Sequence, residues 1–85
     1  MKIGVIGAGV MGRGIAQVSA MAGHTVVLFD INHDTLVTAQ EGIDKNLSKA
    51  IELGKLDADG KSKTLANLQY SNSIADVMVD MVIEA

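Results

Sequence analysis

The residues that most constrain the fold are a short apolar run that opens directly into three closely spaced glycines, KIGVIGAGVMG at positions 2–12. The glycines have the spacing G-x-G-x-x-G, which predicts a phosphate-binding turn only if a strand precedes it, a helix follows it and an acidic residue stands about 20 positions further on. Asp30 meets the third condition, because it follows Gly12 by eighteen positions and ends a second apolar run at 25–29. The rest of the chain is therefore interpreted around this turn.

The apolar residues on either side of the turn meet the other two conditions. Residues 2–7 are apolar almost throughout, which is typical of a parallel strand buried on both faces. In the next segment apolar residues recur at steps of four, three and four, which predicts a helix that buries Met11, Ile15, Val18 and Ala22. Gly23 then predicts the left-handed residue that ends a helix, and residues 25–29 predict a second strand.

A longer amphipathic helix is predicted after the second strand. Asn32 or Asp34 can cap its first turn. Its apolar residues recur at steps of three and four until a glycine at position 54, which predicts a buried stripe made of Leu36, Ala39, Ile43, Leu47, Ala50 and Ile51. This pattern indicates a helix that lies on a sheet.

The remaining residues predict a third helix and two more strands. Residues 55–63 are polar and loop-like, and Asp57 can cap a shorter helix that includes Leu65 and Leu68. Residues 68–71 predict a weak, short strand, and residues 73–76 have the spacing of a capping box. Residues 80–85 predict a final buried strand.

Strands that alternate with helices predict an α/β fold built from parallel βαβ units with right-handed crossovers. We expect a Rossmann-type parallel sheet in the order 3-2-1-4 with flanking helices, truncated after strand 4. In such folds the ligand binds at the switch point between strands one and four. Residues 1–85 are accordingly predicted to be the N-terminal portion of an NAD-binding Rossmann domain.

Composition and charge limit the classes of function. A chain of 85 residues forms one small domain at most, and its net charge of −3 argues against nucleic acid as a partner. The aliphatic composition suits an α/β core, which we expect the methionines to help fill at Met11, Met21, Met78 and Met81. There are no cysteines, and no apolar run reaches the ~18 residues needed to span a bilayer. We therefore expect a cytoplasmic protein without a membrane partner.

Each glycine of the turn has its own predicted role in binding a dinucleotide. Gly7 lets the chain bend sharply out of the strand, Gly9 lets the backbone approach pyrophosphate oxygens, and Gly12 lets the helix pack closely on the sheet. The backbone amides of Val10 and Met11 are the predicted hydrogen-bond donors, at the positive end of the helix dipole. The alternative is that the glycines only make a tight connection between a strand and a helix.

Asp30 is the predicted ribose-binding residue. Its carboxylate would accept hydrogen bonds from the ribose hydroxyls and would repel a 2′-phosphate. Residues 31–34 contain no lysine or arginine that could bind such a phosphate, so NAD is favoured over NADP. The alternative is that Asp30 simply caps the following helix.

No residue of the chain is predicted to be catalytic or to bind a metal. His24 and His33 stand in polar connections without a paired carboxylate at a recognisable spacing. Residues 57–60 have some likeness to a calcium loop, but a lysine and an alanine would occupy its first and twelfth ligand positions. Arg13 lies in the first turn of the helix and could approach a phosphate, although we expect its side chain to point to solvent.

Several segments together carry a more specific resemblance. IGAGVMG at 6–12, GIAQV at 14–18 and AGHTVVLFD at 22–30 resemble the opening of the 3-hydroxyacyl-CoA dehydrogenases. NLSK at 46–49, followed by GKL at 54–56, is similar to the second-helix region of the bacterial 3-hydroxybutyryl-CoA branch, and VIEA at 82–85 resembles the fourth strand of the family. The resemblance covers essentially the whole chain.

The resemblance implies an NAD-dependent enzyme of fatty acid and butanoate metabolism that transfers hydride between NAD and the 3-hydroxyl carbon of an acyl-CoA. It implies contacts with NAD at the glycine turn, at Asp30 and at the backbone near Ala85. It also implies that Asn46 and Lys49 lie near the coenzyme A moiety, although a solvated helix face is the alternative for both. In the family the catalytic residues and the C-terminal substrate and dimerisation domain lie beyond the equivalent of Ala85. The chain is therefore expected to be an N-terminal fragment of an enzyme that is a homo-oligomer at full length.

Two other functions stay open at the level of sequence. The chain could be a stand-alone NAD-binding or redox-sensing module, or the cofactor half of another Rossmann dehydrogenase, such as a 6-phosphogluconate-type enzyme. A stand-alone module has to remain soluble although the edge of its fourth strand is open, which favours aggregation. The match at residues 82–85 argues against a different dehydrogenase.

Overall fold

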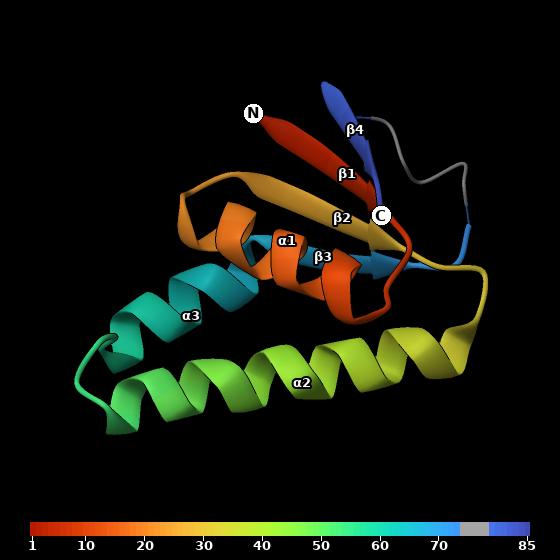
Figure 1. The fold of residues 1–85 in the computed structure, drawn as a ribbon. Helices are drawn as coiled ribbons and strands as arrows, with labels where there is room; N and C mark the ends of the chain where they lie inside the picture. Colours follow the sequence, from red (N-terminus) through yellow and green to blue (C-terminus); the bar gives the residue numbers. More distant parts are fainter. Residues whose placement is uncertain (74–78) are drawn as a thin grey trace.

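The sheet has four parallel strands in the order β3-β2-β1-β4 (Figure 1). β1 (Lys2–Ile6) pairs with β2 (Thr25–Phe29) and with β4 (Met81–Glu84), and β2 also pairs with β3 (Leu68–Ser71). This order confirms the Rossmann-type sheet that the sequence predicts. Its switch point lies between β1 and β4, where the order along the sheet reverses.

The computed structural model describes residues 1–73 and 79–85. The capping box predicted at 73–76 extends into the intervening segment and therefore lies outside the described residues. Within the sheet, Ile6 pairs with Phe29 on one side and with Glu84 on the other. The carboxyl ends of three strands are thus level, and they form the edge at which open α/β sheets bind ligands.

Three helices lie on the same side of the sheet, as two successive right-handed crossovers in one direction require (Figure 1). α1 (Val10–Met21) connects β1 to β2, and α2 (His33–Glu52) followed by α3 (Ala58–Ala66) connects β2 to β3. α3 begins directly after the predicted cap Asp57, so residues 58–63 of the polar, loop-like stretch are helical. Leu68 belongs to β3, so the expectation that it is part of the shorter helix is wrong.

The predicted residues end or cap these helices. The side chain of Asn32 accepts a hydrogen bond from the Thr35 N–H at 3.2 Å, and that of Asp57 accepts one from the Gly60 N–H at 2.7 Å. Gly23 after α1 has a φ of 97°, a left-handed conformation that costs glycine little. Local sequence thus determines where these helices begin and end.

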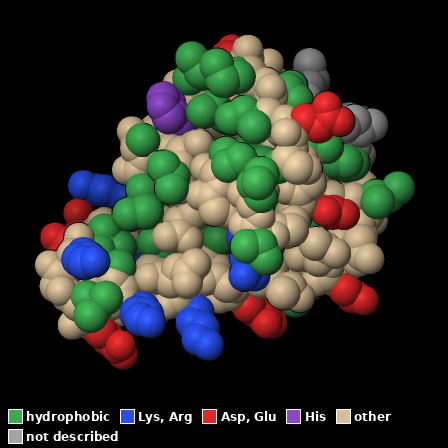
Figure 2. Space-filling model, viewed as in Figure 1, with side chains coloured by type: hydrophobic (Ala, Val, Ile, Leu, Met, Phe, Trp, Pro, Cys, Tyr) green, Lys and Arg blue, Asp and Glu red, His purple; other side chains and the backbone are tan. Residues whose placement is uncertain are grey.

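The buried face of α1 differs from the predicted one. Gly12, Ala16 and Ala20 are buried, whereas the side chains of Met11 and Val18 are 71% and 67% exposed. Residues with small side chains face the sheet because α1 lies too close to it for larger side chains. A Cβ on Gly12, for example, would clash with the backbone of Gly7. Larger apolar side chains of α1 remain on the surface, and hydrophobic side chains gather over this part of the molecule (Figure 2).

β4 and the methionines are also more exposed than predicted. Met81 and Val82 of β4 are 46% and 55% exposed, because β4 is an edge strand of the sheet. Met21 is 47% exposed, so the described methionines do not fill the core as expected, and Met78 lies outside the described residues. Only Ile83 of β4 packs against the core cluster.

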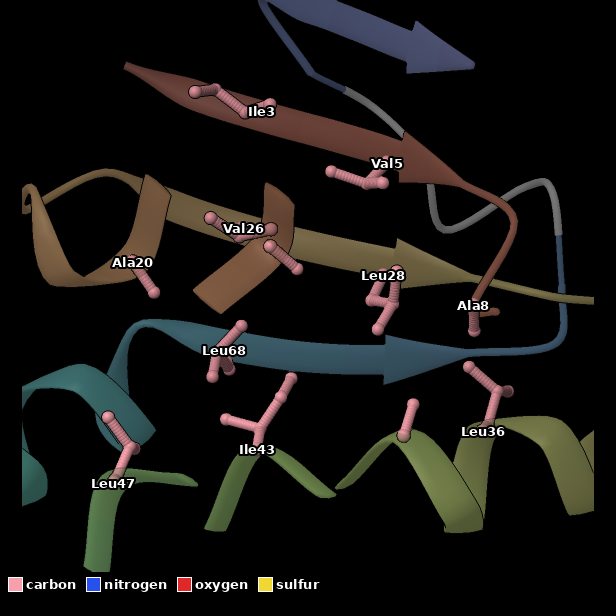
Figure 3. Packing of buried hydrophobic residues seen from close by; sticks show 12 residues of the cluster. Ile3, Val5, Ala8, Ala20, Val26, Leu28, Leu36, Ile43, Leu47 and Leu68 are labelled. Carbon is pink, nitrogen blue, oxygen red and sulfur yellow. The ribbon is translucent and has the colours of Figure 1, made fainter. Parts of the chain in front are cut away.

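The core lies between the sheet and α2 (Figure 3). Leu36, Ile43 and Leu47 point from α2 toward the sheet, where Leu28 of β2 and Leu68 of β3 face them. Ala39 is also fully buried, whereas Ala50 and Ile51, at the end of the predicted stripe, are only half-buried. The stripe from Leu36 to Leu47 is therefore confirmed, and it fixes α2 across the sheet below the glycine turn.

Candidate functional site

The glycine turn joins the end of β1 to the start of α1 at the carboxyl edge of the sheet. Gly7 has a φ of 105°, and its N–H donates to the Phe29 carbonyl oxygen at 2.8 Å. The chain turns there, and α1 begins at Val10 with Gly9 as its N-cap residue. Ala8, between the two glycines, is buried and points toward Leu36 of α2 (Figure 3). The turn is thus anchored on the core as well as on the sheet.

Gly7, Gly12 and Ala85 form one contact cluster. A Cβ on Gly12 would lie 1.6 Å from the Gly7 carbonyl oxygen, and a Cβ on Gly7 would lie 2.6 Å from the Ala85 carbonyl oxygen. The Ala85 N–H donates to the Ile6 carbonyl oxygen at 2.9 Å, which holds Ala85 beside the turn. The structure therefore brings together the end of β4 and the two outer glycines. The bend at Gly7 and the close packing of Gly12 are as the sequence predicts.

The space in front of Gly9 is open. A Cβ on Gly9 would meet no atom within 4 Å, and Gly9 provides no side-chain cap for α1. The first amide groups of a helix have no acceptor within it, and the first turn of α1 contains no acidic residue. The amides of Val10 and Met11 are consequently free of local repulsion toward an anion. The turn therefore combines open space with the amide groups of a helix N-terminus.

Asp30 links the end of β2 to the glycine turn. Its Oδ2 accepts the Ala8 N–H at 2.9 Å and its Oδ1 accepts the Asn32 N–H at 2.9 Å. These two hydrogen bonds hold the pKa of the carboxyl below its ordinary value of 3.8, and the bond from Ala8 has the larger effect. Asp30 is therefore charged at neutral pH. Asn32, not Asp30, caps α2. The alternative that Asp30 serves as the cap is therefore wrong, and its bond to the turn is a role that the sequence did not predict.

A pocket of about 270 Å³ lies between the first turns of α1 and α2. It is bordered by Ala8 and Asn32, the two residues whose amides bind Asp30, and its other walls are made of Gly9, Val10, Arg13, Asp34, Thr35 and Thr38. Arg13 is half-buried, and its guanidinium lies over Gly42 of α2. The expectation that Arg13 points to solvent is thus wrong. The glycine at position 42 is the signal that could have revealed its place.

Asn46 and Lys49 lie on α2, outside the cluster of Gly7, Gly12 and Ala85. Both are exposed, and Asn46 Nδ2 donates to Gln17 Oε1 of α1 at 3.3 Å. Asn46 therefore connects the two helices on the surface. The structure places Asn46 and Lys49 one turn apart on the same part of α2.

A larger pocket lies elsewhere, between α2, α3 and β3, with a volume of about 530 Å³. Tyr70 lines it, and in the described part of the chain its buried hydroxyl has no hydrogen-bond partner. Burial, together with the charge of Asp44, raises the pKa of Tyr70. Size alone does not make this pocket the functional site, because it lacks the helix amides and the strand ends that converge at the glycine turn.

Neither a metal centre nor a membrane span emerges from residues 1–73 and 79–85. These residues contain no group of three histidine, cysteine, aspartate or glutamate side chains that could hold a metal ion. Within the same ranges, every helix is too short or too polar to cross a membrane.

Comparison with known proteins bears on the whole chain. A family model described as "3-hydroxyacyl-CoA dehydrogenase, NAD binding domain" matches residues 2–85. A 3-hydroxyadipyl-CoA dehydrogenase from Escherichia coli K12 is 43% identical over 98% of this chain, which corresponds to 18% of the relative. A 3-hydroxybutyryl-CoA dehydrogenase from Bradyrhizobium diazoefficiens is 39% identical over 98% of this chain and 29% of the relative.

The solved structures agree with the sequence relatives. That of (S)-3-hydroxybutyryl-CoA dehydrogenase from Ralstonia eutropha superimposes with a TM-score of 0.95 at 36% identity, and covers 99% of this chain and 30% of the other. The chain thus spans less than a third of the length of these relatives. The family model names NAD as the dinucleotide of this domain, in agreement with the cofactor that Asp30 predicts. The chain belongs to the 3-hydroxyacyl-CoA dehydrogenase family, and residues 2–85 match its NAD-binding domain.

Proposed function

We propose that this chain is the cofactor half of an NAD-dependent 3-hydroxyacyl-CoA dehydrogenase, which passes hydride between NAD and the 3-hydroxyl carbon of an acyl-CoA. The observation that carries the proposal is the meeting of three features at the carboxyl edge of the sheet: the open turn at Gly9, the Asp30 carboxylate bound to Ala8, and the backbone of Ala85 beside Gly7. NAD supplies the hydride chemistry when it is bound. The residues of this chain bind and orient it.

The glycine turn binds the pyrophosphate. The amides of Val10 and Met11 donate to its oxygens, and the dipole of α1 adds a partial positive charge. Gly9 lets the backbone approach the phosphates, because a side chain at this position would occupy the open space. Ala85 forms the opposite wall and contributes backbone groups.

Asp30 binds the ribose next to the turn. Each of its oxygens already accepts one backbone N–H, and each retains a lone pair for a ribose hydroxyl. Because its pKa is low, the carboxylate is ionised throughout the neutral range and repels a 2′-phosphate. Asp30 therefore selects NAD over NADP.

Asn46 and Lys49 bind the coenzyme A part of the substrate. The support for this role is their exposure on neighbouring turns of α2, together with the CoA substrates in the names of the relatives. An amide and an ammonium group both suit the phosphates and the amide-rich arm of coenzyme A.

The exposed apolar surface supports a function within a larger enzyme. Val10, Met11 and Val18 on α1 are mostly exposed, as are large parts of Met81 and Val82 on β4. Exposed apolar surface of this kind is covered by another part of a protein or by a second subunit in most stable proteins. We expect the complete enzyme to cover it with its substrate domain and to form a homo-oligomer.

Calorimetric titration with NAD, combined with size-exclusion chromatography, tests the proposal. We expect the 85-residue chain to bind NAD weakly, to associate through its apolar surface, and to have no turnover of acetoacetyl-CoA with NADH. A monodisperse chain that binds NAD tightly would support a stand-alone NAD-binding or redox-sensing module instead. A chain that is folded by circular dichroism and does not bind NAD at millimolar concentration would contradict both functions.

A further inference from the structure

The seam between α1 and α2 carries a row of basic side chains. Arg13 comes from α1, and Lys45 and Lys49 come from α2. In Figure 2, Lys and Arg side chains lie along α2 together with Asp and Glu side chains. Lys45 and Lys49 are exposed, and Arg13 is half-buried at the contact between the two helices. This row, Arg13, Lys45 and Lys49, is called the basic seam below.

Gly42 determines where the guanidinium of Arg13 lies. A Cβ at Gly42 would be 2.7 Å from Arg13 Nη1 and 3.1 Å from Cζ, so the guanidinium rests where any other residue would place a side chain. One turn further along both helices, Gln17 and Asn46 meet in a hydrogen bond of 3.3 Å. The two helices therefore contact each other at two successive turns.

The positions on α2 place the other two cations on the same seam. Lys45 and Lys49 are four residues apart and therefore neighbours on one face of α2. From Gly42 to Lys49 the helix rises by about 10 Å, at 1.5 Å per residue. The basic seam therefore spans about 10 Å, with Asn46 between its cations.

None of the three cations has an acidic partner within 4 Å among the described residues. The two ion pairs in residues 1–73 and 79–85 involve other lysines, Lys61 with Asp44 and Lys63 with Asp59. Asp34 lines the same pocket as Arg13, and Glu41 and Glu52 lie about one turn from Lys45 and Lys49 on α2, but none of these acids forms an ion pair with the basic seam. Three unpaired positive charges thus lie together on a chain whose net charge is −3. A cluster of cations without counterions attracts an anionic ligand.

We propose that Arg13 is a further substrate-binding residue, which acts with Lys45 and Lys49 to bind the phosphate groups of the coenzyme A moiety. This inference rests on the proposed function, in which Asn46 and Lys49 face coenzyme A. Coenzyme A carries a phosphomonoester on its ribose and a diphosphate next to it, and three spaced cations complement several such groups. The planar guanidinium can bind one phosphate through two parallel hydrogen bonds, which an ammonium cannot do. Gly42 is the positioning residue that leaves room for it.

Calorimetric titration with coenzyme A at low ionic strength tests the role of Arg13. Arg13→Gln should weaken the binding of coenzyme A about tenfold, the loss of one charge-assisted hydrogen-bonding group. Lys63→Gln removes the same charge from α3, outside the basic seam, and should change the affinity less than about twofold, as expected of a distant, screened charge. Equal losses in the two variants would show an effect of net charge alone and would overturn the inference.

Gly42→Ala separates positioning from structural damage. Its Cβ displaces the guanidinium although Arg13 is still present, so the affinity for coenzyme A should fall several-fold. Alanine is a better helix former than glycine, so the thermal unfolding midpoint should not fall with it. If NMR shows that Arg13 has moved in Gly42→Ala and the affinity for coenzyme A is nevertheless unchanged, the proposed role of the guanidinium in binding coenzyme A is wrong.

Dephospho-coenzyme A identifies the phosphate that Arg13 binds. If the effect of Arg13→Gln disappears with dephospho-coenzyme A, Arg13 binds the ribose phosphomonoester. If the effect persists, Arg13 binds the diphosphate. Both results support the inference. If Arg13→Gln binds coenzyme A as the unmodified protein does while NAD still binds, the inference is wrong and the proposed function stands. If the unmodified protein binds neither NAD nor coenzyme A, both are wrong.

Discussion

Asp30 Oδ2 accepts the backbone N–H of Ala8 at 2.9 Å, although the two residues are 22 positions apart in the sequence. The end of β2 thus holds the middle of the glycine turn through a side chain. The same carboxylate accepts the Asn32 N–H, which fixes the entry into α2. One residue therefore holds both the glycine turn and the entry into α2, which border the pocket between α1 and α2.

Substitution of Asp30 should change the choice of cofactor. Asp30→Ala removes the ribose acceptor and should weaken NAD binding by about 1–3 kcal/mol, the range for a hydrogen bond to a charged group. NADP binding should change little or improve, because the repulsion of the 2′-phosphate is lost. Titration with both dinucleotides measures the difference, and Asp59→Ala on α3 controls for the loss of one negative charge. Equal losses of affinity for NAD and NADP would show that Asp30 does not bind the ribose.

The stability contributed by the Asp30 carboxylate should decrease as the pH falls into the acidic range. The folded-state pKa lies below the ordinary value of 3.8, so the folded protein favours the ionised form. The contribution is therefore fully present well above pH 3.8 and is lost as the pH falls through the lower, folded-state pKa. We expect the difference in unfolding free energy between the unmodified protein and Asp30→Asn to be constant from pH 5 to 7 and to shrink toward pH 3. If urea titrations show that the difference in unfolding free energy grows as the pH falls, the folded-state pKa of Asp30 is not lowered.

Gly12→Ala should be strongly destabilising. Its Cβ would lie 1.6 Å from the Gly7 carbonyl oxygen, which is a backbone atom that cannot rotate away. α1 would have to move off the sheet, which should cost about 3 kcal/mol of unfolding free energy. This value is at the upper end of the range for overpacked sites. Gly14→Ala is the matched control, since its Cβ would meet no atom within 4 Å. That variant should gain about 0.5–1 kcal/mol from helix propensity, and urea unfolding of both variants measures the contrast.

Tyr70→Phe should leave stability unchanged or raise it by up to about 1 kcal/mol, because it removes a buried hydroxyl that has no hydrogen-bond partner among residues 1–73 and 79–85. Thr64→Val is the informative comparison. The hydroxyl of Thr64 is buried and donates to the Gly60 carbonyl oxygen at 2.8 Å, so its loss should cost about 1 kcal/mol. Thermal unfolding of the two variants is sufficient for the comparison. A clear loss of stability in Tyr70→Phe would mean that the hydroxyl binds a group outside the described residues.

Regular periodicity made most of the fold predictable. The stripe from Leu36 to Leu47 and the caps at Asn32 and Asp57 depend on neighbours in the sequence, and the structure confirms them. The sheet order follows from the alternation of strands and helices together with the handedness of crossovers. α1 was predicted less well, because the alanines and glycine that face the sheet give a weak hydrophobic signal. Met11 and Val18 have large apolar side chains, but no element of the described chain covers them.

The sequence by itself determined the class of fold, the position of the glycine turn, and the choice of NAD, since each depends on residue types at short, fixed spacings. Only the tertiary structure decided that Asp30 holds the turn at Ala8, that Ala85 closes on Gly7, and that Arg13 rests on Gly42. Each of these contacts joins residues more than 20 positions apart. Their geometry is set by how closely α1 approaches the sheet and α2, a distance that depends on packing across the whole domain and is not encoded in any local pattern.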